Sequence, residues 1–194
     1  EGDYDYVHVT SNNTIFGTEY HWLPDTKGVP LIADMSSNIC SRELDVSKYG
    51  LIFAGAQKNL GPSGVTLVIV RKDLAERADK KLPSMLQYRT YIAENSLFNT
   101  PPTFGIYMLA LTMEHIQETG GLKGTEARNV AKANTLYEAI DGSNGFYRCP
   151  VNKADRSRMN VNYRIYKGDN ADEELEKKFV KEAEAAGLAG LKGH

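Results

Sequence analysis

The sequence is poor in cysteine and lacks both a strong excess of one charge and any long apolar run. Its 194 residues include two cysteines, too few for a disulfide framework, so reduced thiols are expected. The cysteines and the four histidines show no ligand spacing, and we expect no bound metal. Lys and Arg number 23 against 25 Asp and Glu, which excludes the basic footprint of nucleic-acid binding. No apolar stretch approaches the roughly 20 residues of a membrane span. We therefore expect a cytoplasmic protein that acts on small molecules, without nucleic-acid or membrane partners.

The most informative segment is 51–64, LIFAGAQKNLGPSG. An apolar run ends in small residues, Lys58 follows at once, and Gly61, Pro62 and Gly64 then turn the backbone. An amine at the end of a buried strand is poorly solvated and gives up its proton more easily than an exposed one. Such an amine can form a Schiff base with an aldehyde. On this segment alone, an ordinary solvated lysine is the commoner case.

A second apolar run, 28–34, ends in a carboxylate at Asp34. Continuous apolar runs are typical of parallel strands buried on both faces, whose carboxyl ends meet at one ligand-binding edge of the sheet. Pyridoxal phosphate needs this pair, a lysine for its aldehyde and a carboxylate facing its ring nitrogen. A contact ion pair worth about 4 kcal/mol would keep that nitrogen protonated. The alternative for Asp34 is a helix N-cap after the strand, with Ser36 and Ser37 as turn formers.

Several segments together resemble one known family. Residues 54–64, AGAQKNLGPSG, are closely similar to the cofactor-lysine segment of the phosphoserine aminotransferases, a fold-type I branch of the pyridoxal-phosphate enzymes. Further agreement, in the same order along almost the whole chain, lies in segments 11–17, 33–37, 41–50, 98–104 and 157–161.

The resemblance implies a role for each matching position. Lys58 would hold the cofactor and move the proton at the substrate Cα, and Asp34 would face the pyridine nitrogen. Thr14 would contact the side of the ring, and Gln57 the phosphate. A separate pair, Asn99 and Thr100, would reach the cofactor phosphate of the other subunit in a homodimer.

Two of the implied positions carry a qualification. Thr100 stands before Pro101 and Pro102, so it is also a candidate N-cap of the helix that follows, and both readings are compatible. His194 resembles a family histidine near the substrate phosphate, but it is the last residue of the chain.

The predicted fold class is α/β. Residues 1–120 are expected to form the C-terminal portion of a pyridoxal-phosphate-binding large domain, a mostly parallel sheet with flanking helices. Residues 121–194 are expected to form an incomplete, smaller α+β domain, with the boundary near Gly120. Strands are predicted at 6–10, 65–70 and 159–165, and helices at 104–118, largely buried, and at 130–140 and 175–186.

The activity that the resemblance implies is amino transfer from L-glutamate to 3-phosphohydroxypyruvate, giving O-phospho-L-serine and 2-oxoglutarate in serine and pyridoxine biosynthesis. We expect the chain to be a fragment that lacks an N-terminal part and the C-terminal end. Two alternatives remain open. The chain could belong to another fold-type I aminotransferase, of the alanine–glyoxylate or serine–pyruvate type, or it could be a catalytically inert piece.

Overall fold

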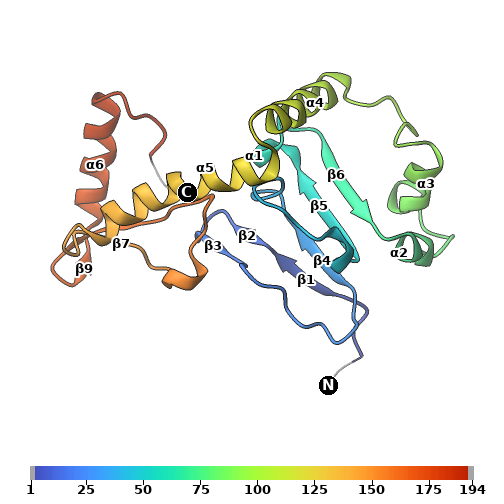
Figure 1. Ribbon diagram of the computed structural model, residues 1–194, viewed down its shortest axis with the longest axis horizontal. Coiled ribbons are helices and arrows are strands. Elements are labelled where there is room, and N and C mark those ends of the chain that lie inside the picture. The colour runs from blue at the N-terminus through green and yellow to red at the C-terminus, as the bar shows by residue number, and fades with distance from the viewer. Residues whose placement is uncertain (1–2, 192–194) are drawn as a thin grey trace. The chain divides into compact units, whose positions relative to one another are not determined.

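The computed structural model describes residues 3–191, and the chain divides into two compact units (Figure 1). The first unit contains the chain up to Asn12 and Trp22–Ala127, and the second contains Asn13–His21 and the chain from Arg128 on. Within residues 3–191, no helix has the length and apolar character needed to cross a bilayer.

The first unit is built on a four-stranded sheet in the order β1-β4-β5-β6 (Figure 1). Three strands are parallel: β1 (Val7–Thr10), β4 (Leu31–Asp34) and β5 (Leu51–Gly55). The fourth, β6 (Thr66–Val70), runs antiparallel to β5. The predicted strands at 6–10 and 65–70 and the parallel pairing of the two apolar runs are therefore confirmed, as is the α/β class.

The core of this unit lies on β4, β5 and the chain that directly follows each of them. Buried and half-buried side chains alternate along β4, and β5 is buried at Leu51, Ile52 and Ala54. Ala33, Ala54 and Ala56 are fully buried, so a larger side chain at any of them has no space. The buried cluster consists of Leu31, Ala33, Met35, Ile39, Tyr49, Ile52, Ala54, Ala56 and Leu60.

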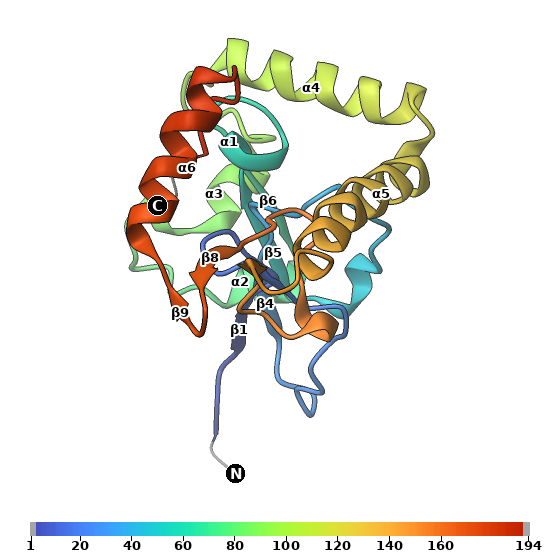
Figure 2. The same cartoon turned by 90° about the vertical axis from the view of Figure 1, so that its left-hand side faces the viewer.

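One short helix connects β5 to β6, and two further short helices and one long helix follow β6. The helices are α1 (Ala56–Asn59), α2 (Lys72–Arg77), α3 (Tyr88–Ala93) and α4 (Thr103–Glu118), with single 3₁₀ turns at Val46–Lys48 and Ser84–Leu86. Figures 1 and 2 show α1 at the end of β5.

The prediction that the helix at 104–118 is largely buried is wrong. Phe104 is 72% exposed and Tyr107 is 58% exposed, and only Gly105 is fully buried on α4. The apolar side chains of this helix point in several directions, whereas the described core contacts only one side of it, through Leu109 and Met113. Apolar character therefore predicted the helix correctly but not its burial.

The alternative role of Thr100 as an N-cap is also not realised. The helix begins at Thr103, its N-cap is Pro102, and no side chain caps it. Pro101 and Pro102 fix φ and disfavour helical backbone before them, which moves the start of the helix beyond the reach of Thr100.

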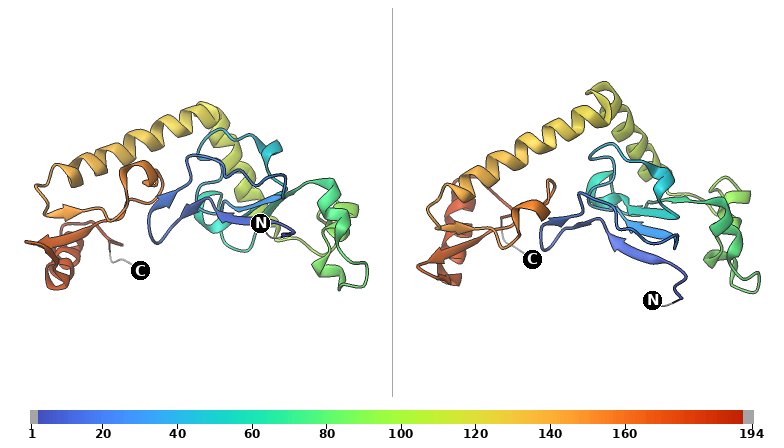
Figure 3. Two further views of the ribbon diagram at one scale, coloured as in Figure 1. Left: turned by 90° about the horizontal axis from the view of Figure 1, so that it is seen from below. Right: turned by 60° about the horizontal axis from the view of Figure 1, so that its bottom comes forward.

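The second unit combines a small antiparallel sheet with two helices. The sheet has the order β7-β8-β9, and the helix α6 lies beside β8 (Figure 3). T-shaped ring contacts join Tyr147 and Tyr163 of this unit to Phe179 on α6. The elements that lie wholly or partly in this unit are β2 (Asn12–Asn13) paired with β3 (Thr18–Glu19), α5 (Gly121–Asp141), β7 (Tyr147–Arg148), a 3₁₀ turn at Lys153–Asp155, β8 (Arg164–Lys167), β9 (Asn170–Ala171) and α6 (Glu173–Ala185). Asn12 of β2 and the first turns of α5, up to Ala127, belong to the first unit.

The predicted strand at 159–165 is wrong in its first part, because β8 begins only at Arg164. The alternation of polar and apolar residues was a correct observation, but Ser157 upstream bends the chain. Its Oγ accepts the N–H groups of Met159 (3.0 Å) and Asn160 (2.9 Å), which removes these donors from any strand pairing.

The chain turns sharply at Gly120, where φ is +101°, and this turn separates α4 from α5. The border between the two compact units lies further along the chain, within α5, and residues 13–21 belong to the second unit. The division into domains at 120/121 stays a proposal.

Candidate active site

The strand register brings the two chemically important residues to one edge of the sheet. Asp34 is the last residue of β4 and lies opposite Thr10 on β1 and Phe53 on β5. From there β5 continues to Gly55 and passes directly into α1, which carries Lys58. Since all three strands are parallel, the acid and the amine follow carboxyl ends at the same edge, where open α/β sheets bind ligands.

The Asp34 carboxylate is held by the turn that follows it. Its Oδ1 accepts two hydrogen bonds from Ser36, one from the backbone N–H (2.8 Å) and one from the hydroxyl (2.6 Å). Across residues 3–191, Oδ2 takes part in no hydrogen bond. The alternative reading of Asp34 is therefore half right, since the carboxylate supports a turn but no helix begins there.

The same turn holds α1 at both of its ends. Ser36 Oγ accepts the N–H of Gly55 (3.0 Å), the residue before the helix. At the other end Asn59 Nδ2 donates to the carbonyl of Ile39 (2.5 Å). These two bonds enclose Lys58 in the sequence, so the turn after β4 fixes the short segment that presents the amine.

The expectation that Lys58 is poorly solvated is wrong for the described chain, because its side chain is exposed. The strand ends before the lysine, and one turn of helix carries it past the edge of the sheet. Ala56 and Leu60 are the anchors of this turn, with 0% and 1% of their surface exposed. Residues four apart lie on one face of a helix, so Lys58, midway between them, lies on the opposite face.

Gln57 is exposed and lies over Gly55, at the start of the same turn. A methyl group at Gly55 would lie 2.7 Å from Gln57 Oε1. The absence of a side chain at position 55 therefore leaves the space that the Gln57 amide occupies.

The other predicted site residues lie elsewhere in the chain. Thr14 is half-buried in the turn between β2 and β3, which belongs to the second unit. Asn99 and Thr100 are exposed in the segment that precedes α4, and Asn99 Nδ2 donates to the Thr100 carbonyl (3.1 Å). His194 lies outside the described residues.

The sequence interpretation missed the polar residues beneath Asp34. Ser11 Oγ lies 2.6 Å from Asn38 Oδ1 and 3.0 Å from the Asp34 carbonyl oxygen, and its single proton can be donated to one of them at a time. The Ser11 backbone N–H also donates to the Asp34 carbonyl (3.0 Å), and the side chains of Ser11 and Asn38 are buried. These bonds join the end of β1 to the turn after β4. The sequence did contain a sign of this polar cluster, because two serines and an asparagine follow Asp34 within four residues. The two serines were interpreted only as turn formers.

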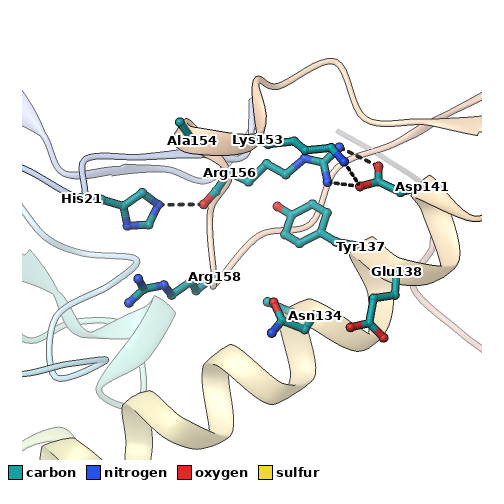
Figure 4. A pocket seen from close by; sticks show the side chains of 10 residues that line it. His21, Asn134, Tyr137, Glu138, Asp141, Lys153, Ala154, Arg156 and Arg158 are labelled. Carbon is teal, nitrogen blue, oxygen red and sulfur yellow. Dashed lines mark hydrogen bonds and ion pairs between the residues drawn. The ribbon is translucent and has the colours of Figure 1, made fainter.

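A second polar cluster lines an open pocket of about 730 Å³ in the second unit (Figure 4). The Arg156 guanidinium donates to both carboxylate oxygens of Asp141 (2.9 and 2.8 Å) and lies 4.6 Å from the centre of the Tyr137 ring. Hydrogen bonds from Arg156 and Lys153 hold the pKa of Asp141 far below its usual range. Burial raises the pKa of Tyr137 to about 12. None of the site residues predicted from the sequence lines this pocket.

The fold and the residues at the sheet edge define a class of protein. It is an α/β protein with an aspartate and a lysine at the carboxyl edge of a mainly parallel sheet. The chain belongs to the aminotransferase class-V family, whose model matches residues 1–191. The similarity to the phosphoserine aminotransferases expected from the sequence is confirmed by the comparisons with known proteins.

The relatives are similar over nearly the whole chain. A phosphoserine aminotransferase from Lysinibacillus sphaericus is 57% identical over 189 residues, which are 97% of this chain and 51% of that protein. The solved phosphoserine aminotransferase from Bacillus circulans subsp. alkalophilus is 55% identical, with a TM-score of 0.92 and the same shares. One from Trichomonas vaginalis, solved with pyridoxal phosphate bound, is 42% identical with a TM-score of 0.90, over 97% of this chain and 52% of that one. The chain spans about half the length of the curated relatives it matches.

The residues at the sheet edge fit pyridoxal phosphate. The ring nitrogen needs a carboxylate oxygen, and Asp34 offers Oδ2 while its other oxygen is occupied by Ser36. The aldehyde needs a primary amine within the same site, and Lys58 follows the neighbouring strand. Within residues 3–191 no group of three or more His, Cys, Asp or Glu side chains could hold a metal ion.

Proposed function

We propose that the full protein containing this chain is a pyridoxal-phosphate-dependent aminotransferase that transfers the amino group of L-glutamate to 3-phosphohydroxypyruvate, giving O-phospho-L-serine and 2-oxoglutarate. The observation that supports the proposal is the position of Asp34 and Lys58, which lie at or just after the carboxyl ends of two neighbouring parallel strands. The 57% identity to a phosphoserine aminotransferase supports the choice of substrates. The cytoplasmic location expected from composition stays a prediction.

Each residue of the edge has a definite task in this proposal. When bound, pyridoxal phosphate supplies an aldehyde that condenses with amines and a ring that withdraws electrons from the substrate Cα. Lys58 would hold the cofactor before the substrate arrives. Its released amine would move the proton from the Cα of the amino donor to C4′ of the cofactor in the first half-reaction, and from C4′ to the Cα of the amino acceptor in the second. Asp34 keeps a proton on the ring nitrogen through an ion pair.

Three further residues would bind cofactor or substrate and take no part in proton transfer. Gln57, beside the lysine, donates its amide N–H to the cofactor phosphate. Thr14 contacts the side of the ring, as the resemblance implies. The resemblance also implies that His194, which lies outside the described residues, binds the substrate phosphate.

The role of Lys58 is tested by covalent trapping in the full-length protein. Borohydride reduction should fix the cofactor on residue 58 of the wild type, detectable by peptide mass, and Lys58→Ala should lose both the label and turnover while keeping its thermal stability. Lys48→Ala, which removes an exposed lysine of the same unit, is the matched control and should retain both. Wild-type turnover in Lys58→Ala would refute the role.

The amino acceptor is tested separately. With glutamate as donor, 3-phosphohydroxypyruvate should be used with the highest kcat/KM, and pyruvate and glyoxylate should be poor acceptors. The reverse order would identify an aminotransferase of the alanine–glyoxylate or serine–pyruvate type. Wild-type protein that never binds or traps the cofactor would indicate a non-catalytic chain.

We further propose that Asn99 and Thr100 complete the site of a partner subunit in a homodimer. Both are exposed, and the two prolines that follow hold their backbone rigid at low entropic cost. Exposed apolar side chains next to them, Leu97 (61%) and Phe98 (46%), are suited to an interface.

Subunit mixing tests this arrangement. Lys58→Ala and the double variant Asn99→Ala/Thr100→Ala should each be impaired alone. Because a mixed dimer contains one site with both sets of residues intact, mixing should restore about a quarter of the wild-type activity. No recovery in a verified mixed dimer would place the pair in the same subunit as its lysine.

A further inference from the structure

We propose that Ser36 is a positioning residue that aims the Asp34 carboxylate relative to the helix that carries Lys58. Its hydroxyl bonds both to the Asp34 carboxylate and to the N–H of Gly55, the residue before α1. The inference rests on the proposed function, since it assigns the supporting partner of the proposed cofactor carboxylate.

The direction of the hydrogen bonds around Ser36 is fixed by the chemistry of its neighbours. The N–H of Gly55 can only donate, so at 3.0 Å the Ser36 oxygen accepts from it. An ionised carboxylate can only accept, so the single hydroxyl proton of Ser36 points to Asp34 Oδ1 at 2.6 Å. The two bonds form one chain from the start of α1 to the carboxylate, and each bond polarises the other.

This arrangement distinguishes the two oxygens of the carboxylate. The backbone N–H of Ser36 also donates to Oδ1, at 2.8 Å, so two donors hold the same oxygen. Rotation of the carboxylate would break both bonds, and bonds to a charged acceptor are stronger than those between neutral groups. Oδ2 is thereby held in one direction, available for the protonated ring nitrogen of the cofactor.

The neighbouring serine has the same chemistry but other partners. Ser37 Oγ donates to the carbonyl of Asn12 (2.8 Å) and accepts from Asn12 Nδ2 (2.8 Å). Ser37 is buried, in the same turn, with two hydrogen bonds, and it bonds to neither Asp34 nor Gly55. It is a matched control, because its removal loosens the turn without releasing the carboxylate.

The test uses the full-length protein loaded with pyridoxal phosphate and three variants: Ser36→Ala, Ser36→Thr and Ser37→Ala. Two quantities are measured besides thermal stability: the cofactor dissociation constant and the visible circular dichroism per bound cofactor, which reports how firmly the ring is oriented. Ser36→Ala should raise the dissociation constant about 10-fold, the loss expected for one hydrogen bond to a charged group. It should also reduce the circular dichroism at least about two-fold.

The controls separate positioning from general weakening. Ser37→Ala should lower thermal stability by a similar amount yet keep both cofactor readouts within about two-fold of the wild type, and Ser36→Thr should restore them by returning the hydroxyl. Equal losses in Ser36→Ala and Ser37→Ala, or failure of Ser36→Thr to recover, would overturn the inference. If Ser36→Ala does not fold, Ser36→Cys replaces it and should fall between wild type and full loss, since a thiol is a weak donor.

The two proposals fail in different ways. A wild-type protein that binds no cofactor would refute the proposed function and, with it, the role of Ser36. A wild type that traps cofactor on Lys58, together with an unaffected Ser36→Ala, would refute the role of Ser36 alone.

Discussion

Among single residues, the Arg156–Asp141 pair of the second unit allows the most direct test of an electrostatic contribution. The Arg156 side chain is only 11% exposed, and it makes a two-point contact with a carboxylate that is 35% exposed. Two parallel bonds in a partly desolvated setting contribute more than a surface pair, but solvent screening of Asp141 limits the gain to about 1 kcal/mol.

We predict that Asp141→Asn lowers the free energy of unfolding by about 1 kcal/mol at neutral pH. The pKa of Asp141 is depressed in the folded state, so its contribution is fully present above the unfolded pKa, near pH 4, and is lost as pH falls through the lower folded pKa. Denaturant unfolding at pH 7 and at successive steps below pH 4 measures the change. The difference in the free energy of unfolding between Asp141→Asn and the wild type should become smaller only below about pH 4.

The control for this prediction is Asp155→Asn, an exposed aspartate in the neighbouring 3₁₀ turn. It should change the free energy of unfolding by less than about 0.5 kcal/mol at every pH. A gap for Asp141→Asn that stays constant down to pH 2 would mean that charge is not the cause.

Some of the candidate site residues could be predicted from the sequence, and others could not. Asp34 and Lys58 could be predicted because each follows an apolar run, so topology alone brings them to one edge. Ser36 could not, because its role depends on the N–H of Gly55, which is distant in the sequence and meets it only through strand pairing. The exposure of Lys58 was also missed, because the hydrophobic pattern of the strand does not predict the single turn of helix that follows it.

At the scale of elements, Gly55, the residue before α1, leaves the space in which the Gln57 amide lies. A side chain at position 55 should therefore affect cofactor binding through Gln57. We predict that Gly55→Ala costs less than about 1 kcal/mol of stability, because the three atoms nearest to the new methyl group all belong to the end of the exposed Gln57 side chain. The displaced amide should weaken cofactor binding about 10-fold, the loss of roughly one hydrogen bond to the charged cofactor phosphate. Calorimetric titration with pyridoxal phosphate, together with a thermal melt, measures both quantities.

Gly61→Ala provides the comparison on the other side of α1. A methyl group there meets nothing closer than 3.8 Å, so stability and cofactor affinity should both remain near wild type. If Gly55→Ala and Gly61→Ala weaken the cofactor equally, displacement of Gln57 is not the reason.

Elements were predicted best where local pattern and tertiary pairing agree. The β-branched run at 65–70 forms β6 as expected. The alternating run at 159–165 fails before Arg164 because one hydroxyl, that of Ser157, takes the backbone donors that a strand would need. Apolar composition predicted α4 but could not reveal which of its faces meets the described core.

At the scale of the whole molecule, α4 of the first unit presents apolar side chains to solvent. Phe104, Tyr107 and Leu111 recur at helical spacing and are 72%, 58% and 37% exposed. Large apolar patches are rare on soluble monomers and mark interaction surfaces. The helix therefore needs a partner surface, either from more of the same protein or from a second molecule.

We predict that a polypeptide of residues 1–194 produced alone self-associates, and that Phe104→Glu with Leu111→Lys reduces the association at least about 10-fold. Light scattering and gel filtration over a concentration series measure it. Glu114→Lys, a charge reversal on the same helix, should have little effect. A wild-type chain that stays monomeric at high concentration would contradict the prediction.

The anchoring of α1 by Ala56 and Leu60 determines how this part of the chain can vary in evolution. Each residue inserted into a helix rotates everything after it by about 100°. One extra or missing residue between the two anchors would swing the amine away from the solvent-facing side and force an apolar anchor outward. Families that keep this architecture should therefore tolerate changes of residue type around the lysine far better than changes in segment length, and alignments across distant members should be free of gaps there.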